Sequence, residues 1–222
     1  MNQKTGNDLS FMGIKWDSFM ITDIAEIISG RIIPEDERIA GNIPYVTSSA
    51  MNNGVTHFIG NVNDTLESEC ISVNSNGSVG YAFYHPYEAL YSSDCRKLRL
   101  KYKNKYASIF IAVSITSQHE KYNYGYKLGT ARLMRQKIML PVNQNGEPDY
   151  AFMERFMKCT EQKLIHEYIS VKHATGGGVK LLSDIDTWPG INLYPVVFLF
   201  FQSFRNQFCL LFYRRDIQAI TG

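Results

Sequence analysis

The chain has 222 residues with 45% hydrophobic side chains, which is typical of one globular domain plus an extension. The formal net charge is only +2, so a nucleic-acid site would have to come from local clusters of basic residues. Four widely spaced cysteines without a Cys-x-x-Cys pair argue against a disulfide framework or zinc site and predict reduced thiols in a cytoplasmic protein. The polar start MNQKTGNDLS lacks the apolar core of a signal peptide, so we expect no export.

The first predicted element is a short strand within residues 14–21, followed by one or two helical turns over residues 22–29. Gly30 is expected to end this helix, because glycine readily adopts the backbone conformation found just past helix ends. Trp16 is predicted to belong to the core. Arg31, just past the turn, is a candidate phosphate contact.

A second strand around residues 43–46 leads into a polar loop that ends at Gly54. Hydroxyl and amide side chains suit base edges and phosphates, and asparagine can bond adenine through two hydrogen bonds. The candidate nucleic-acid contacts in this loop are Thr47, Ser48, Asn52 and Asn53. The alternative is an ordinary hydrogen-bonded turn, since Ser, Asn and Gly dominate turns for local reasons.

Alternating apolar residues on both sides of Asn76-Gly77 predict a β-hairpin over residues 71–84. Its glycines are not a phosphate-binding loop, because neither a helix nor a Lys-Ser/Thr pair follows them. The candidate nucleic-acid contacts of the hairpin are Asn74, Asn76 and Tyr84.

Residues 96–105 carry six basic residues and no acidic one. Alternate residues of a strand share a face, so Lys97, Arg99 and Lys101 would form a line of positive charge while the leucines between them pack. We predict phosphate contacts from these three cations. The alternative is an exposed edge strand whose lysines discourage pairing with other chains.

Aromatic, glycine and basic residues interleave between residues 121 and 132, a composition that suits contacts to the nucleic-acid backbone and base edges. The candidates in this loop are Lys121, Tyr124, Lys127 and Arg132.

A short apolar strand at residues 138–140 is ended by Pro141, and Asn145-Gly146 predicts a turn after it. Asp149 is the expected cap of a helix that runs from residue 150 to about residue 172. Apolar residues at helical spacing give this helix a stripe for binding a partner, with the candidate contacts Phe152, Phe156, Leu164 and Tyr168.

Ordered motifs along the chain resemble a target recognition domain, as found in specificity subunits of type I restriction–modification systems and in related fused restriction–methylation enzymes. These motifs are the opening run Trp-x-x-Phe-x-Ile-x-Asp-Ile, the run Pro-Tyr-Val-Thr-Ser before Asn-Asn-Gly, the Asn/Gly hairpin, and Ile-x-Leu-Pro-Val followed by Gly-x-Pro-Asp and a Met-containing helix. The resemblance covers roughly residues 14–170.

The resemblance implies an α+β fold with a β-rich domain and a long C-terminal spacer helix. It places the recognition domain at residues 14–148 and a spacer or dimerisation helix, of coiled-coil type, at residues 149–175. It also implies a helix over residues 107–117. We interpret residues 176–222 as an atypical tail, with Trp188 as the truncated start of a second recognition domain.

The function implied by the resemblance is sequence-specific binding of double-stranded DNA that directs methyltransferase and restriction subunits to a target site. S-adenosylmethionine and ATP are then expected in the partner subunits and not in this chain. The helix would bind a second copy, another specificity subunit or the methyltransferase subunits. The apolar run at residues 194–201 is too short to span a bilayer, so no membrane is expected. Two alternatives remain open: a recognition fragment of a fused enzyme, and an oligomerising module that does not bind DNA.

Catalysis by the chain itself is not expected. Pro148-Asp149 with Glu161 and Lys163 formally matches a nuclease pattern, but Glu161 lies roughly 18 Å along the same predicted helix, too far to share a metal with Asp149. No glycine-rich cofactor turn and no Asn/Asp-Pro-Pro-aromatic motif of a methyltransferase is present, and no histidine is predicted to pair with a nucleophile. We therefore predict neither a catalytic residue nor a metal ligand.

Overall fold

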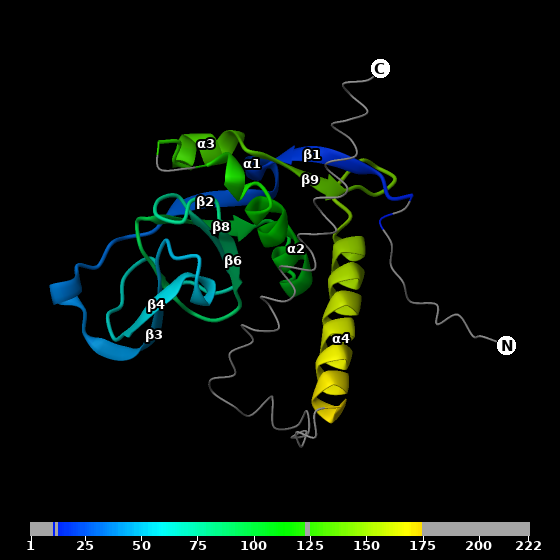
Figure 1. The fold of residues 1–222 in the computed structure, drawn as a ribbon. Coiled ribbons are helices and arrows are strands. Elements are labelled where there is room, and N and C mark those ends of the chain that lie inside the picture. The colour runs from blue at the N-terminus through cyan, green and yellow to red at the C-terminus, as the bar shows by residue number, and fades with distance from the viewer. Residues whose placement is uncertain (1–10, 12, 123–124, 175–222) are drawn as a thin grey trace. The chain divides into compact units, whose positions relative to one another are not determined.

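The computed structural model describes residues 11, 13–122 and 125–174, and Figure 1 shows how their elements are arranged. The chain divides into two units, Phe11–Arg155 and a second unit whose described part is the helix from Phe156 onward. Strands and helices are mixed in the first unit, as predicted. Its strands form three sheets: β1 (Trp16–Met20) with β9 (Lys137–Pro141); β2 (Ala25–Ser29), β8 (Cys95–Leu100), β5 (Cys70–Asn74) and β6 (Ala82–His85); and β4 (Val55–Ile59), β3 (Ala40–Val46) and β7 (Leu90–Tyr91).

The first strand confirms the prediction, but the helix after it is shorter than expected. Helix α1 covers only Ile21–Ile24, and the backbone N–H of Met20 donates to the Asp23 carboxylate at 2.8 Å. The residues of β2, predicted to be helical, pair antiparallel with β8 instead. Gly30 does not end a helix. A Cβ at this position would lie 2.2 Å from the carbonyl oxygen of Ser92, so the glycine permits a close backbone approach.

The predicted hairpin is formed by β5 and β6, which pair antiparallel with Val73 opposite Ala82. The basic strand β8 lies between β2 and β5 and is therefore a central strand, not the edge strand considered above. It also ends at Leu100, so Lys103 and Lys105 do not continue its charged face.

Helix α2 (Lys105–Thr116) confirms the helix that the family resemblance implied. The Asn104 side chain accepts hydrogen bonds from the backbone N–H groups of Tyr106 and Ala107, which satisfies two free donors of the first turn. The helix packs against β5, β6 and β9. At the end of the helix, Thr116 Oγ1 accepts a hydrogen bond from the Ala82 N–H and donates one to the Ala82 carbonyl. These bonds attach the helix to β6, the edge strand of the four-stranded sheet.

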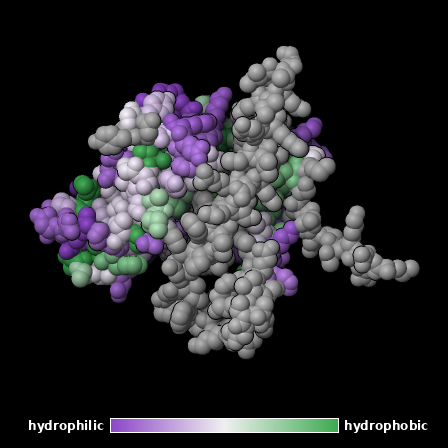
Figure 2. Space-filling view, viewed as in Figure 1, coloured by the Kyte–Doolittle hydropathy of each residue, from purple (hydrophilic) through white to green (hydrophobic). Residues whose placement is uncertain are grey.

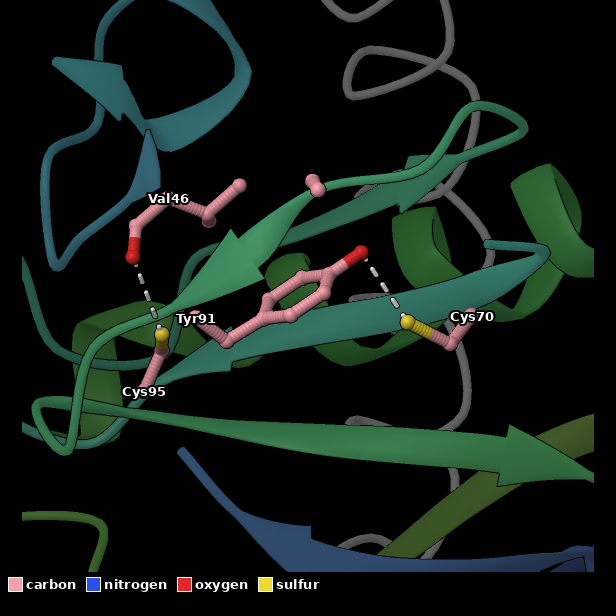
Figure 3. Close-up of a cluster of buried hydrophobic side chains, with 5 residues drawn as sticks. Val46, Cys70, Tyr91 and Cys95 are labelled. Atoms are coloured by element: carbon pink, nitrogen blue, oxygen red, sulfur yellow. Dashed lines mark hydrogen bonds between the residues drawn. The ribbon is translucent and has the colours of Figure 1, made fainter. Parts of the chain in front are cut away.

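Two of the four cysteines lie in a buried cluster with Val46, Ala89 and Tyr91, where the three-stranded and four-stranded sheets meet (Figure 3). The Cys70 thiol donates to the Tyr91 hydroxyl oxygen at 3.1 Å, and the Cys95 thiol donates to the Val46 carbonyl at 3.6 Å. Burial raises the pKa of Cys70 to about 11 and that of Cys95 to about 12. Cys70, Cys95 and Cys159 are free thiols in the structure, and Cys209 lies outside the described residues.

The end of the first unit follows the predicted order of strand, turn and helix. Strand β9 is followed by a turn in which Gly146 N–H donates to the Asn143 carbonyl at 3.1 Å. Helix α4 (Tyr150–Ala174) then begins, and the Asp149 carboxylate accepts from the Phe152 N–H at 2.8 Å. The predicted cap at Asp149 is confirmed. The tail 176–222, with Trp188 and the apolar run 194–201, lies outside the described residues. Among the helices that are described, none is both long and apolar enough to cross a membrane.

Replacing Asp149 with alanine should lower the free energy of unfolding by about 1 kcal/mol, because the first turn of α4 loses the acceptor for a free N–H group. Asp149→Asn keeps an acceptor oxygen and should cost much less. Urea denaturation followed by circular dichroism measures both variants. Equal losses for the two would show that the capping bond contributes nothing.

The remaining helix, α3 (Thr130–Arg135), and three short 3-10 turns, η1 (Glu35–Glu37), η2 (Asn52–Gly54) and η3 (His119–Lys121), lie in connections between strands. Three of these four elements carry candidate site residues.

Candidate nucleic-acid interface

Most candidate residues gather at one end of the four-stranded sheet, where β2 and β5 finish and β8 and β6 begin. We call this region the loop end. It comprises residues 47–54, 75–81, 92–96, 118–122 and 125–135. Hydrogen bonds and ring contacts connect these segments, which come from four separate connections in the chain: β3–β4, β5–β6, β7–β8 and the connection from α2 to β9.

The polar loop at residues 47–54 is the first part of the loop end. The Thr47 N–H donates to the Gly54 carbonyl at 2.8 Å, which closes the connection between β3 and β4. The Ser48 carbonyl accepts from the Ser78 N–H at 3.0 Å, so the loop is fastened to the β5–β6 hairpin. Asn52 is exposed and Asn53 half-buried. The structure therefore places four predicted residues, Thr47, Ser48, Asn52 and Asn53, side by side.

The hairpin turn contributes Asn76, which is half-buried at the edge of this loop. Its Nδ2 donates to the Asp94 carboxylate at 3.0 Å, and its backbone N–H donates to the Asp94 carbonyl at 3.2 Å. Asn76 is therefore occupied in joining the hairpin to residues 92–96. Asp94 is a carboxylate at the loop end that was not among the candidate residues predicted from the sequence.

An arginine–tyrosine stack forms another part of the loop end. The Arg132 guanidinium lies 3.7 Å from the centre of the Tyr126 ring, and that ring is stacked on Tyr122 at 6.0 Å. Arg132 also donates to the Lys127 carbonyl at 2.6 Å. Figure 2 shows hydrophilic side chains over α3, where Arg135 is exposed. Neither Arg132 nor Arg135 forms an ion pair with the described residues.

Two contacts join this stack to the rest of the loop end. Arg96 Nε donates to Thr130 Oγ1 at 2.7 Å, and the Tyr81 and His119 rings are 4.7 Å apart. Lys121, on the same connection, is exposed and reaches Gln118 Oε1 at 3.2 Å. The predicted residues Lys121, Lys127 and Arg132 thus share one surface, while Tyr124 lies outside the described residues.

The predicted line of positive charge along β8 does not exist as an interface. The Lys97 side chain is 2% exposed, and its ammonium group lies 2.7 Å from the Glu67 carboxylate and 3.2 Å from the Thr65 carbonyl. Arg99 is paired with the same Glu67 at 2.7 Å and with Glu26 at 2.8 Å. Acidic residues from elsewhere in the chain therefore neutralise this strand face.

Glu67 is the centre of this ion-pair group. Burial alone would raise the pKa of its carboxyl, but the hydrogen bonds from Arg99 and Lys97 outweigh burial and lower the pKa below its ordinary value of 4.5. Lys101 lies at the other end of the sheet and donates to the backbone carbonyl oxygens of Thr22 and Asp23. Lys97 is thus a core residue, and Arg99 and Lys101 lie away from the loop end.

Three further candidates, Asn74, Tyr84 and Arg31, are not among the residues that define the loop end. Asn74 is fully buried and donates to the Ser49 carbonyl at 2.9 Å, so it cannot touch a base, although it supports the polar loop. Tyr84 is half-buried on the edge strand β6, and burial raises its pKa. Arg31 is exposed just past β2 but pairs with Asp64 at 3.4 Å.

One histidine does pair with a hydroxyl group, which the sequence did not predict. His85 Nε2 lies 2.8 Å from Ser72 Oγ, and its other ring nitrogen lies 3.3 Å from the Tyr87 hydroxyl. Ser72 and His85 are both 0% exposed, so no substrate reaches the pair. Burial lowers the pKa of His85 to about 3, and the ring is neutral. Among the described residues no group of three or more His, Cys, Asp or Glu side chains is placed to hold a metal.

Residues 13–169 match the family model of the type I restriction modification DNA specificity domain. The chain belongs to this family. The match includes the loop end and most of helix α4, so all the features described above are parts of a specificity domain.

Two relatives carry names that agree with the family. The chain is 39% identical over 158 residues to the type II restriction enzyme BgcI specificity subunit of Heyndrickxia coagulans, covering 70% of this chain and 46% of that one. It is 25% identical over 151 residues to the type I restriction enzyme MpnII specificity subunit of Mycoplasma pneumoniae, covering 67% of this chain and 44% of that one. The chain thus spans about half the length of these curated relatives.

Solved structures confirm the fold. The specificity domain is similar to the S subunit of a type I restriction–modification system from M. genitalium, with a TM-score of 0.54 and 18% identity over 74% of this chain and 44% of that one. It is also similar to the HsdS subunit of Thermoanaerobacter tengcongensis, with a TM-score of 0.50 and 11% identity over 72% of this chain and 39% of that one.

Proposed function

We propose that this specificity domain reads one part of a split target in double-stranded DNA and directs methyltransferase and restriction subunits to it. The observation that carries the proposal is the loop end of a family member. Amides, hydroxyls, tyrosines, and two arginines that form no ion pair with the described residues share one surface, although they come from separate connections. Basic groups there would contact phosphates and set affinity, while neutral polar groups would contact base edges and set specificity.

The partner site of the proposal is helix α4, but not over its whole length. Phe152 is 3% exposed with its ring 6.2 Å from that of Phe11, and Phe156 is 5% exposed. Both are buried, which corrects their prediction as partner contacts. The side chains of Leu164 and Tyr168 lie outside the described part of the structure. We place the partner-binding face on the helix beyond Phe156.

A second recognition unit completes the proposed assembly. A second copy or another specificity subunit, joined through α4, would supply the other part of the target. Catalysis, with S-adenosylmethionine and ATP, would belong to the partner subunits. Titrating the chain with labelled S-adenosylmethionine, with and without a methyltransferase subunit, tests where that cofactor binds.

The double variant Arg132→Ala/Arg135→Ala should bind duplex DNA more weakly at every sequence, because two phosphate contacts are lost. Each lost contact should reduce the slope of log K against log salt by about 0.9. Fluorescence anisotropy with a labelled duplex, between low and physiological salt, measures the slope.

Lys101→Ala is the matched control, because this exposed cation lies at the other end of the sheet and should leave the slope unchanged. An unaltered slope in the double variant would remove α3 from the interface. If the folded chain did not bind duplex DNA at low salt, the proposed function would be wrong. That result would favour the alternative of an oligomerising module that does not bind DNA.

A further inference from the structure

The turn Met51-Asn52-Asn53 has an unusual backbone. Asn52 and Asn53 have φ angles of 50° and 52°, so two successive residues other than glycine lie in the left-handed region. This conformation costs free energy for any residue with a Cβ and persists only where the surroundings hold it. Asparagine tolerates it best when its side chain bonds its own backbone locally, but neither amide here makes a hydrogen bond to a described residue.

The β5–β6 hairpin holds this turn in place through hydrogen bonds and close packing. Buried Asn74 donates to the Ser49 carbonyl, and the Ser78 N–H donates to the Ser48 carbonyl. Gly77 packs so closely that an added Cβ would lie 2.6 Å from Ser48 Oγ. Within the turn, the Met51 N–H bonds Ser49 Oγ at 3.0 Å. These contacts fix the backbone and leave the two amides available.

The chemistry of the turn fits a base edge better than a phosphate. Residues 47–54 contain no charged side chain, whereas Arg132 and Arg135 supply positive charge at the same end of the domain. An amide offers one donor and one acceptor side by side. A phosphate presents only acceptors, but the major-groove edge of adenine presents an acceptor and a donor at matching spacing. Met51, 63% exposed beside these amides, suits contact with a thymine methyl group.

We propose that Asn52 and Asn53 are specificity-determining residues that read adenine in an A·T pair from the major groove, with Asn74 and Gly77 as positioning residues. This inference rests on the proposed function, because it assumes that the loop end meets duplex DNA. Base reading would then belong to the turn Met51-Asn52-Asn53, and phosphate binding would belong to α3.

The test is Asn52→Gly/Asn53→Gly in the full chain, because glycine adopts left-handed angles freely and removes only the amides. Selection from a randomised duplex library, followed by sequencing of the bound fraction, measures the base preference at each position. The unaltered chain should prefer adenine at one or two neighbouring positions. The variant should lose about 5- to 140-fold of that preference, the fold-change for one paired amide contact, and keep its affinity for random duplexes. Asn145→Gly, an exposed turn asparagine after β9, is the matched control and should keep the preference.

Three results would overturn the inference. An unchanged preference in the glycine variant would show that the turn does not read bases. An equal loss on all duplexes would show that the amides contact the backbone. In both cases the unaltered chain still binds DNA, so the proposed function stands. No duplex binding by the folded, unaltered chain would overturn both.

Discussion

Replacing Glu67 with glutamine should lower the free energy of unfolding by about 3–5 kcal/mol, the range for removing one partner of a buried ion pair. Lys97 is 2% exposed, so without the carboxylate its charge stays buried without an opposite charge. Arg99 loses a charged partner at the same time. Urea denaturation of the purified chain measures the loss.

Two further variants make this prediction specific. Glu69→Gln alters the exposed 3.8 Å pair with Lys103 and should cost less than about 1 kcal/mol. Adding Lys97→Met to Glu67→Gln removes the buried charge and should recover most of the stability. The recovered double variant should bind duplex DNA as the unaltered chain does, because Lys97 is not a phosphate contact. If Glu67→Gln and Glu69→Gln cost the same, the ion pair is not the stabilising feature.

Stability should also fall as the pH is lowered from 6.5 towards 3, because of His85. The pKa of His85 is about 3 in the folded protein and near 6.5 in the unfolded chain, so the unfolded state binds more protons between these values. Each pH unit below 6.5 then favours unfolding by up to about 1.4 kcal/mol. Between pH 7 and pH 5 this one group should cost about 2 kcal/mol.

His85→Gln should flatten this slope, although it lowers stability at neutral pH by disturbing the contacts to Ser72 and Tyr87. His57→Gln, on an exposed strand residue, is the control. Glu67 affects stability only at lower pH. Because its pKa is lowered in the folded protein, its contribution to the free energy of unfolding is present above pH 4.5 and is lost only below it. An equally steep decline between pH 6.5 and 5 in the His85 variant would contradict the assignment.

Local sequence signals predicted the elements whose causes are local. Asn76-Gly77 specified the β5–β6 hairpin through its backbone preferences, and Asp149 specified the start of α4 by capping it. The motifs also predicted the family, since residues 13–169 match its model. The helix expected at residues 22–29 shows the opposite case. Pairing with β8, which is seventy residues away, decided the conformation of β2.

The sequence by itself determined the type of fold, the family and the residue types available for recognition. The tertiary structure decided which of those residues face solvent at a common surface. Six basic residues between positions 96 and 105 suggested a phosphate-binding strand, but Glu67 pairs with Lys97 and Arg99, and Glu26 pairs with Arg99. Such pairing depends on contacts between residues at least thirty positions apart, and no local pattern encodes it. For the same reason the gathering of residues 47–54, 75–81 and 125–135 at one end of a sheet follows only from the order in which the strands are paired.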